Sequence, residues 1–478
     1  MRGIFIINRF FYGTLFFIIL SCKVYSQFGS SGTLDARSIG MAKTYIATSQ
    51  GIQSIGTNPA NLSLMGDNSV EFYTVFPLPL LSFHSGTDFM TLENFNYYFG
   101  GVDGSARYLT EDDKRKFNDL FNNGGLIFAN FSTTLLSISI QPSIEFGTIA
   151  LTMNDYAGGS FTIPKAFIDL GLNGNQPGRN YDFSDEKFKS WWIRNYSLSY
   201  SRELLNDSEE SLSKVLAGFS IKLVHGYYYA GIEEIRSDIQ TSSMHEIAGN
   251  ADMTGYSSFS SAFGVKYDFD SVDQKSNLSL FMPPAGNGFG FDIGASLLFD
   301  NTWSLSFAVT DIGKINWTQN TAKFSLTGDF FIDDLTDQEQ LDSLEDKISR
   351  SSEKIGSFST GLPTALRIGT GCFLNEENNF LPGNLSLGLD FNQGLNDLPG
   401  NSKKPRISFG MEWKPGDWIP YFRSGISIGG AEGFGWAFGL GMYSPIIDFN
   451  FATSNFQGII VPSTVKQISI AFDSKWKF

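Results

Sequence analysis

Residues 465–478, VKQISIAFDSKWKF, form the stretch of sequence that decides the fold. Bulky apolar residues occupy its even positions and polar residues its odd positions. The even set is Ile468, Ile470, Phe472, Trp476 and Phe478, and the odd set is Gln467, Ser469, Asp473, Lys475 and Lys477. An alternation of period two over about 11 residues is typical of a tilted transmembrane β-strand. An amphipathic edge strand of a soluble sandwich alternates in the same way, so one strand leaves both folds open.

The same alternation recurs along the chain. Apolar residues take every second position in residues 136–140, 196–200, 219–223, 291–299, 305–309, 385–391, 407–413 and 434–442, and the positions between are mostly polar or glycine. Aromatic residues stand beside predicted turns, as in the interfacial girdles of membrane barrels. These are Trp413, Trp418, Tyr421, Tyr443 and Trp476. The pattern predicts an all-β fold, a transmembrane antiparallel β-barrel of about 14 strands.

The composition agrees with a barrel and excludes other classes. The chain has 478 residues, of which 17% are charged, against about 25% in soluble domains. Past residue 20 no apolar run is long enough for a membrane-spanning helix. The net charge of −15 argues against a nucleic-acid partner, because such a partner requires basic patches.

The first 26 residues have the pattern of a secretory signal peptide. Arg2 and Arg9 precede a short apolar core at residues 10–20, and Val24-Tyr25-Ser26 offers a cleavage site. Lipidation at Cys22 is an alternative. Cleavage after residue 26 would leave Cys372 as the one cysteine, which excludes an intramolecular disulfide. We therefore expect an exported protein.

Counting strands back from a periplasmic C-terminus assigns sides to the connections. Residues 375–382, 414–419 and 443–444 become periplasmic turns, and residues 393–403, 429–433 and 454–464 become extracellular loops. We expect residues 157–189 to form a long loop. Two polar insertions are predicted to be helical, one beginning at Thr110 and one near 331–361, where Thr336 and Glu339 form a capping box.

The N-terminal part of the mature chain differs from the rest. Residues 30–66 are rich in small residues, lack a strand-length alternation and contain the turn Asn58-Pro59. We expect residues 27–66 to form a compact plug of short helices and turns inside the lumen of a barrel built from residues 67–478. A plug that is separate from the wall gives a barrel a gate, which favours transport.

Two elements of this segment resemble the N-terminal hatch of the FadL family of outer-membrane transporters for hydrophobic compounds, which has PorV-type barrels as relatives. Arg37, Gly40 and Met41 match the first element, and Asn58, Pro59, Ala60 and Leu62 match the second. The resemblance implies passive transport of hydrophobic or amphipathic molecules across the outer membrane of a Gram-negative bacterium, with these residues as gating candidates. The PorV likeness implies an alternative, a membrane anchor or shuttle for secreted or surface proteins.

The chain end carries a second resemblance. Phe472, Trp476 and the terminal Phe478 are similar to the C-terminal signal that the barrel-assembly machinery reads in bacterial outer-membrane proteins. We therefore expect that machinery and outer-membrane lipid as partners, beside a hydrophobic ligand or a secreted protein.

An enzyme is not indicated. His84, His225 and His245 have no metal-ligand spacing and no nucleophile motif beside them. We expect no catalytic residue, no metal and no cofactor. A general aqueous porin fits less well, because the plug would obstruct its flow.

Overall fold

The computed structural model describes residues 35–478, apart from residues 103–104, 123, 185–186, 208–209, 243–245, 266–275, 334–348, 376–380, 417 and 431–432. The predicted signal peptide, Cys22, His245 and the capping box at Thr336 lie outside these residues. No helix in the described part of the chain has the length and hydropathy needed to cross a membrane.

The described chain is mostly β-strand. The strands are β1 (Val70–Thr74), β2 (Leu80–Thr87), β3 (Gly125–Ser143), β4 (Gly147–Ile163), β5 (Asn180–Asp182), β6 (Lys187–Asn206), β7 (Leu212–Thr241), β8 (Ile247–Phe259), β9 (Gly286–Phe299), β10 (Trp303–Trp317), β11 (Ala322–Ile332), β12 (Ser349–Lys354), β13 (Phe358–Gly361), β14 (Ala365–Leu374), β15 (Asn384–Gly394), β16 (Arg406–Lys414), β17 (Tyr421–Gly429), β18 (Gly433–Tyr443), β19 (Ile447–Thr453) and β20 (Gln467–Lys477). The helices are α2 (Ala36–Gly40), α3 (Leu92–Phe99), α4 (Glu111–Asp119), α5 (Lys165–Asn173) and α7 (Gln457–Ile460), and the 3₁₀ turns are η1 (Gly51–Ser54), η2 (Pro59–Ser63), η3 (Ser261–Phe263) and η4 (Pro462–Thr464).

Within the described residues the strands close into an antiparallel barrel of 14 wall positions, which confirms the predicted fold. The order around the ring is β1 and β2 in one position, then β3, β4, β6, β7, β9, β10, β14, β15, β16, β17, β18, β19 and β20. Closure is made by β20, which pairs with β1 at Phe72–Trp476 and with β2 at Leu81–Phe472. A closed ring leaves no unpaired wall edge in lipid.

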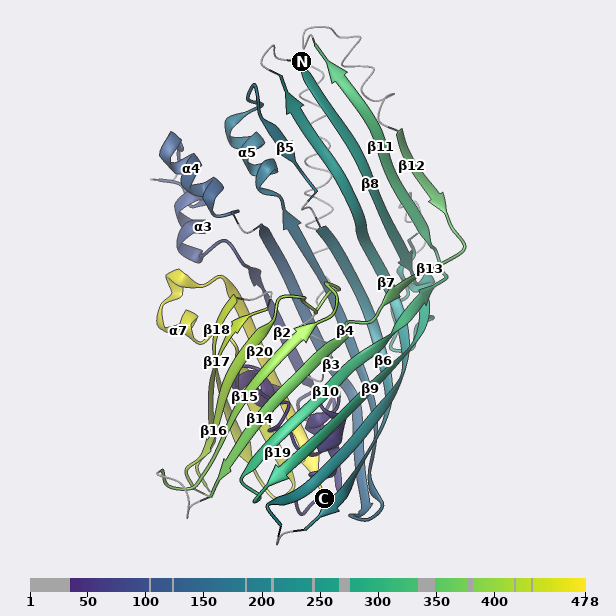
Figure 1. Cartoon of the computed structure of the whole chain (residues 1–478), viewed down its shortest axis with the longest axis vertical. Coiled ribbons are helices and arrows are strands. Elements are labelled where there is room, and N and C mark those ends of the chain that lie inside the picture. The colour runs from purple at the N-terminus through teal and green to yellow at the C-terminus, as the bar shows by residue number, and fades with distance from the viewer. Residues whose placement is uncertain are drawn as a thin grey trace.

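Successive wall residues face opposite sides, as the alternation predicts. In β20, Ile468 and Ile470 are exposed on the outer surface, whereas Ser469 and Asp473 are buried in the lumen. The strand ends that flank the predicted turns 375–382, 414–419 and 443–444 lie at the end of the barrel that holds the C-terminus. The strand ends that flank the predicted loops 393–403, 429–433 and 454–464 lie at the opposite end, hereafter the outer end (Figure 1).

Part of the sheet continues beyond the ring. The outer half of β7 pairs with β8, β8 with β11 and β11 with β12, and these strands rise above the wall in Figure 1.

The long loop predicted at 157–189 is wrong, because this range contains regular structure. Strand β4 runs to Ile163 and is followed by α5, β5 and the start of β6. Two glycines of this range, Gly158 and Gly159, sit within β4, where Gly159 lies against Ser190 of β6.

The helix predicted in the insertion at 331–361 falls on residues 334–348, which lie outside the described residues. The described part of the insertion contains the end of β11, then β12 and β13. The helix predicted at Thr110 is present as α4, and Thr110 and Asp113 form its capping box.

The first wall position is interrupted. Between β1 and β2, residues 75–79 leave the sheet, and Val75 and Phe76 are exposed on the outside. The last strand fastens this segment, because Ser474 donates to Leu78 O (2.7 Å) and the Trp476 indole donates to Phe76 O (3.1 Å). Strand β20 therefore holds residues 75–79 in place between β1 and β2.

The C-terminal aromatic residues give the first testable prediction. Phe72 stacks on Trp476 at 5.9 Å and on Phe478 at 5.7 Å between ring centroids. The variant Trp476→Ala with Phe478 deleted should lower the folded fraction severalfold, because it removes the aromatic contacts that close the ring. Semi-native electrophoresis of outer membranes measures this fraction. Trp418→Ala, at an exposed turn, is the control, and equal folding of both variants would contradict the prediction.

Candidate functional site

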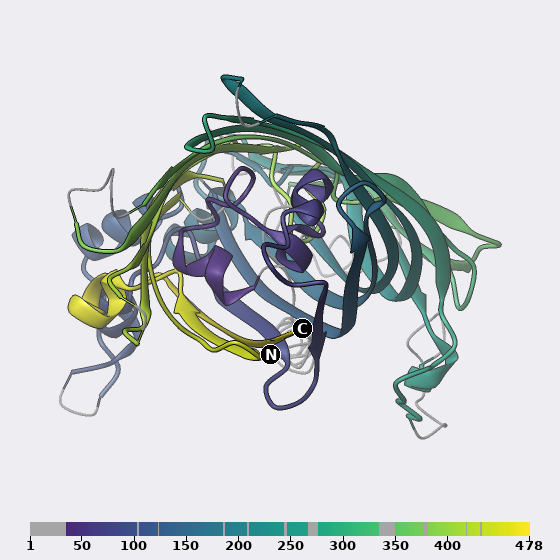
Figure 2. The same cartoon turned by 90° about the horizontal axis from the view of Figure 1, so that it is seen from below.

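The N-terminal segment from residue 35 to residue 66, hereafter the plug, lies inside the ring in the half nearer the C-terminus (Figures 1 and 2). Its turns are capped by its own side chains. Asp35 accepts from the backbone N–H of Ser38 and starts α2, while Asn58 accepts from Ala60 N and precedes Pro59 at the start of η2. The predicted turn at Asn58-Pro59 is therefore present.

Arg37 forms a two-pronged ion pair between plug and wall. Its guanidinium binds both carboxylate oxygens of Glu412 on β16, at 2.9 and 2.8 Å. Arg423 on β17 donates to the same carboxylate at 2.6 Å. All three side chains are at least nine-tenths buried, so two guanidiniums share one acid at the lumenal wall. A two-pronged pairing of this kind fixes orientation as well as position.

Three more wall carboxylates accept backbone N–H groups of the plug. Asp473 on β20 accepts from Ala36 N at 2.8 Å, and Asp390 on β15 accepts from Tyr45 N and from Ile46 N. Glu71 on β1 accepts from Ile52 N at 2.8 Å and also pairs with Lys475 on β20. These acids pair backbone donors that the short turns of the plug leave open.

The second element of the plug, residues 58–62, contacts a different part of the wall. The Asn58 amide donates to Ser296 on β9 at 2.9 Å, and Ser296 donates to Asn61 at 2.6 Å. Leu62 is fully buried in an apolar cluster of the plug and the wall, which comprises Ile52, Ile55, Leu62, Tyr73, Leu80 and Ala150. Together the two elements fasten the plug to both sides of the lumen.

Lumenal glycines form the seat of the plug. A methyl group on Gly410 of β16 would lie 2.5 Å from the carbonyl oxygen of Met41, and one on Gly425 of β17 would lie 2.7 Å from it. Gly40 lies against Gly439 of β18. The second element meets glycine too, since Gly218 of β7 faces Pro59 O and Gly294 of β9 faces Asn58. The plug backbone thus approaches the wall more closely than any side chain would allow.

All seven predicted gating candidates are buried at this contact, namely Arg37, Gly40, Met41, Asn58, Pro59, Ala60 and Leu62. Sequence reasoning did not single out their wall partners Glu412, Asp390, Asp473 and Glu71. The available indication of these partners was that they are charged residues on the polar face of strands whose other face is apolar. Tyr421 and Tyr443 are not in an interfacial girdle, because both rings lie close to the buried Arg423.

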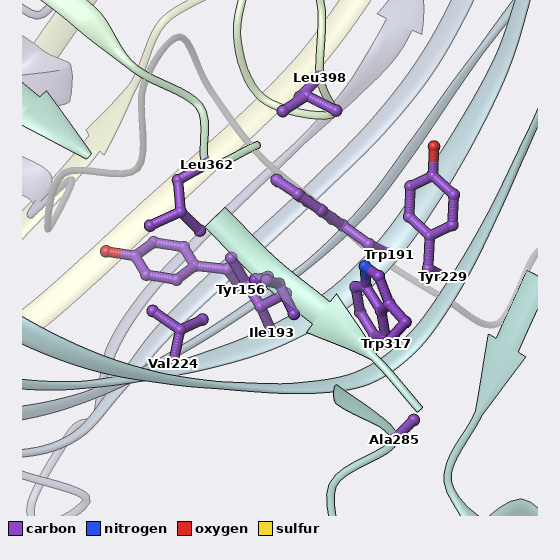
Figure 3. Close-up of a cluster of buried hydrophobic side chains, with 10 residues drawn as sticks. Tyr156, Trp191, Ile193, Val224, Tyr229, Ala285, Trp317, Leu362 and Leu398 are labelled. Carbon is purple, nitrogen blue, oxygen red and sulfur yellow. The ribbon is translucent and has the colours of Figure 1, made fainter. Parts of the chain in front are cut away.

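A cavity of about 1390 Å³ opens above the plug at the outer end. Its lining mixes cationic, anionic and apolar side chains. Examples are Lys187, Lys404 and Arg406, Asp88 and Glu233, and Leu126, Phe128 and Leu398. Leu398 also belongs to the buried cluster of Figure 3, where Leu362 and Leu398 come from loops and meet Tyr156, Trp191 and Trp317 of the wall. The loop after β15 therefore folds inward and narrows the lumen.

The described residues contain no group of three or more His, Cys, Asp or Glu side chains placed to hold a metal ion. His84 is buried and hydrogen-bonded to Gln467 at 2.9 Å, and His225 packs on Tyr196.

The glycine seat yields a prediction. Gly410→Leu should weaken docking of the plug by about 1–3 kcal/mol, the usual cost of overpacking, because the new side chain would displace the Met41 backbone. Hydrogen-exchange protection of residues 36–48 in the detergent-solubilised barrel measures docking. Gly356→Leu, where no atom lies within 4 Å of an added Cβ, is the matched control. Unchanged protection in Gly410→Leu would refute a tight seat.

A pH prediction follows from Asp35. Burial, and next the charge of Asp473, raise the pKa of Asp35 to about 7, whereas an undocked aspartate has a pKa near 4. Between about pH 4 and about pH 7 the docked plug keeps a proton on Asp35 that the undocked plug has released. Docking should therefore weaken as pH rises through this range and stay constant above about pH 7.

Protection factors of residues 36–48 at pH 5 and pH 8 measure this dependence. Asp35→Asn keeps a good helix cap and should make the profile less steep, because one of two interacting carboxylates is removed. A wild-type profile as flat as that of the variant would contradict the pKa assignment.

Comparisons with known proteins add the following. No curated protein matches the chain. The Ralstonia pickettii toluene transporter TbuX is 12% identical, over 93% of this chain and 98% of its own, with a TM-score of 0.46. The Pseudomonas putida toluene transporter TodX is 11% identical, over 95% and 99%, with a TM-score of 0.44.

A Pseudomonas aeruginosa FadL homologue is 11% identical, over 95% of this chain and 99% of its own, with a TM-score of 0.46. Transporters of the FadL type, the family that the N-terminal elements resemble, are thus among the solved structures similar to this chain. The fold assignment rests on the strand pairing described above. The model of one family, DUF5723, matches residues 67–453, and the chain therefore belongs to DUF5723, a family of unknown function.

Proposed function

We propose that the protein is a channel of the Gram-negative outer membrane that passes hydrophobic or amphipathic small molecules without an energy source. The observation that carries the proposal is a separate plug seated across the lumen beneath an open cavity. Residues 1–26 would direct export, and the C-terminal end of the barrel would face the periplasm. The cavity would then face the cell exterior and receive the solute.

The lining of the cavity favours amphipathic solutes. Charged groups of both signs, such as Lys187 and Asp88, stand beside Phe128 and Leu126, so the cavity offers ionic, hydrogen-bonding and apolar contacts together. Passage inward requires the plug to shift. In this proposal Arg37, Gly40, Met41, Asn58, Pro59, Ala60 and Leu62 are gating residues, since each lies in the contact that a shift would break.

The Arg37–Glu412 pair gives the sharpest test. Glu412→Gln should weaken docking of the plug by about 2 kcal/mol, which is less than the loss of a buried partner costs, because the amide oxygen still accepts a hydrogen bond. The conductance of the purified barrel in planar bilayers should rise, and deletion of residues 30–66 should raise it further.

Glu111→Gln is the control, because its pair with Lys114 lies on the exposed helix α4 and is far from the lumen. Wild-type conductance in both Glu412→Gln and the deletion, with the barrels folded, would overturn the plugging role. Swelling of liposomes in an amphipathic solute then tests transport separately from plugging.

A second candidate is an anchor or shuttle for secreted or surface proteins, as in the PorV likeness. The observation in its favour is the sheet of β7, β8, β11 and β12 that projects beyond the ring and offers a surface to a protein. A protein recovered in equal amount with the barrel from outer membranes favours this role, and a bound small amphipath favours the channel. No enzymatic activity, metal or cofactor is part of either proposal.

A further inference from the structure

The wall changes its construction near the outer end of β19. This strand ends at Thr453, opposite Phe438 of β18, whereas β18 and β20 continue outward. Residues 454–466 follow instead. Ser454 N donates to Ser469 on β20 at 3.3 Å and Phe456 N donates to Trp436 O on β18 at 2.7 Å. The loop therefore bridges the two neighbouring strands.

The helix in this loop, α7, packs on the outer surface of the wall. Phe456, which precedes it, stacks on Phe438 at 4.7 Å and meets Trp436 edge-on at 5.3 Å. The rings of Trp436 and Phe438 face outward. This follows because the next residue, Gly439, faces the plug at Gly40 and side chains alternate along a strand. Figure 2 likewise shows α7 outside the ring.

Beyond this contact α7 presents apolar side chains to its surroundings. Ile459 is 68% exposed, Ile460 55% and Val461 46%. The backbone of the segment pairs largely with itself, as in Val461 N to Gln457 O at 2.8 Å and Gly458 N to Asn455 O at 3.0 Å. Backbone that is satisfied in this way can lie in an apolar medium.

Helix α3 extends the same surface. It is joined to the loop by Leu92 N donating to Val465 O at 2.8 Å. Leu92, Phe95 and Phe99 share one helical face by their spacing, and all three are exposed. Helix α3 also packs on α4, where Tyr98 meets Phe117 at 4.7 Å and Phe99 meets the same ring edge-on at 6.0 Å.

We infer that six residues of α3, α7 and the position after α7, hereafter the lipid patch, insert among the acyl chains of the outer leaflet around the barrel. The lipid patch comprises Leu92, Phe95, Phe99, Ile459, Ile460 and Val461. None of the six is charged. Their surface continues the outward face of the wall, where Ile468 and Phe434 are 66% and 57% exposed near the outer end of β20 and β18. An apolar surface adjoining the lipid-facing wall is covered most simply by the same lipid.

A fluorescent label tests this contact. In the full chain with Cys22→Ser and Cys372→Ser, the variants Ile460→Cys and Phe95→Cys are labelled with bimane and reconstituted into phosphatidylcholine vesicles. Doxyl-labelled lipid should quench both labels strongly, and aqueous iodide should quench them weakly. The measured quantity is the ratio of the two quenching constants.

Two control positions bracket the result. Ile468→Cys faces lipid on β20, and Tyr108→Cys is 96% exposed in a loop. We expect Ile460→Cys and Phe95→Cys to match the ratio at Ile468 within about twofold. A ratio like that at Tyr108 would overturn the inference. Protection from both quenchers would also overturn it, because another protein surface or a second copy of the chain would then cover the lipid patch.

Discussion

The rest of the structure depends on one constraint, that the N–H groups and the charge of the plug must find partners inside the lumen. A plug of short turns leaves many of its N–H groups without partners, and the wall must supply them. Asp473, Asp390 and Glu71 accept such donors, and Glu412 holds Arg37 between two strands. The inner face of the barrel is therefore specialised for one particular occupant, the protein's own N-terminal segment.

The two faces of each strand obey different requirements as a result. Outward positions need only be apolar, because lipid accepts any bulky side chain. Inward positions must match the plug in shape, with glycine where Met41 and Pro59 approach the wall and an acid where a donor arrives. This difference explains why large apolar residues and very small ones alternate so regularly in the sequence.

The difference also explains what sequence could predict. Period-two alternation needs only an apolar outward face beside a polar or glycine-rich inward one, so it predicted the barrel, about 14 strands and the ends of the strands after residue 360. The plug segment stood out because its small residues and Asn58-Pro59 contrast with a strand pattern, and the seven residues within it were named from the resemblance to the FadL hatch. The wall partners of the plug could not be predicted from sequence. The pair of Arg37 and Glu412 joins positions 375 residues apart, and finding it requires the register of the whole ring. Tyr421 and Tyr443 were misassigned because proximity to a turn does not determine which face an aromatic ring takes. The loop expected at 157–189 failed for a similar reason, since Gly158 and Gly159 allow close strand packing as readily as a turn.

The order in which the chain is made has a consequence for quality control. The plug leaves the ribosome before any wall strand, yet Asp390, Glu412, Arg423 and Asp473 belong to strands in the last quarter of the polypeptide. A chain cut short by premature termination would therefore keep Glu71 and Ser296 as partners of the plug but lack the carboxylates of Asp390, Glu412 and Asp473. Full seating of the plug therefore requires the complete ring, and an unfinished chain leaves Ala36, Arg37 and Tyr45 without their wall partners.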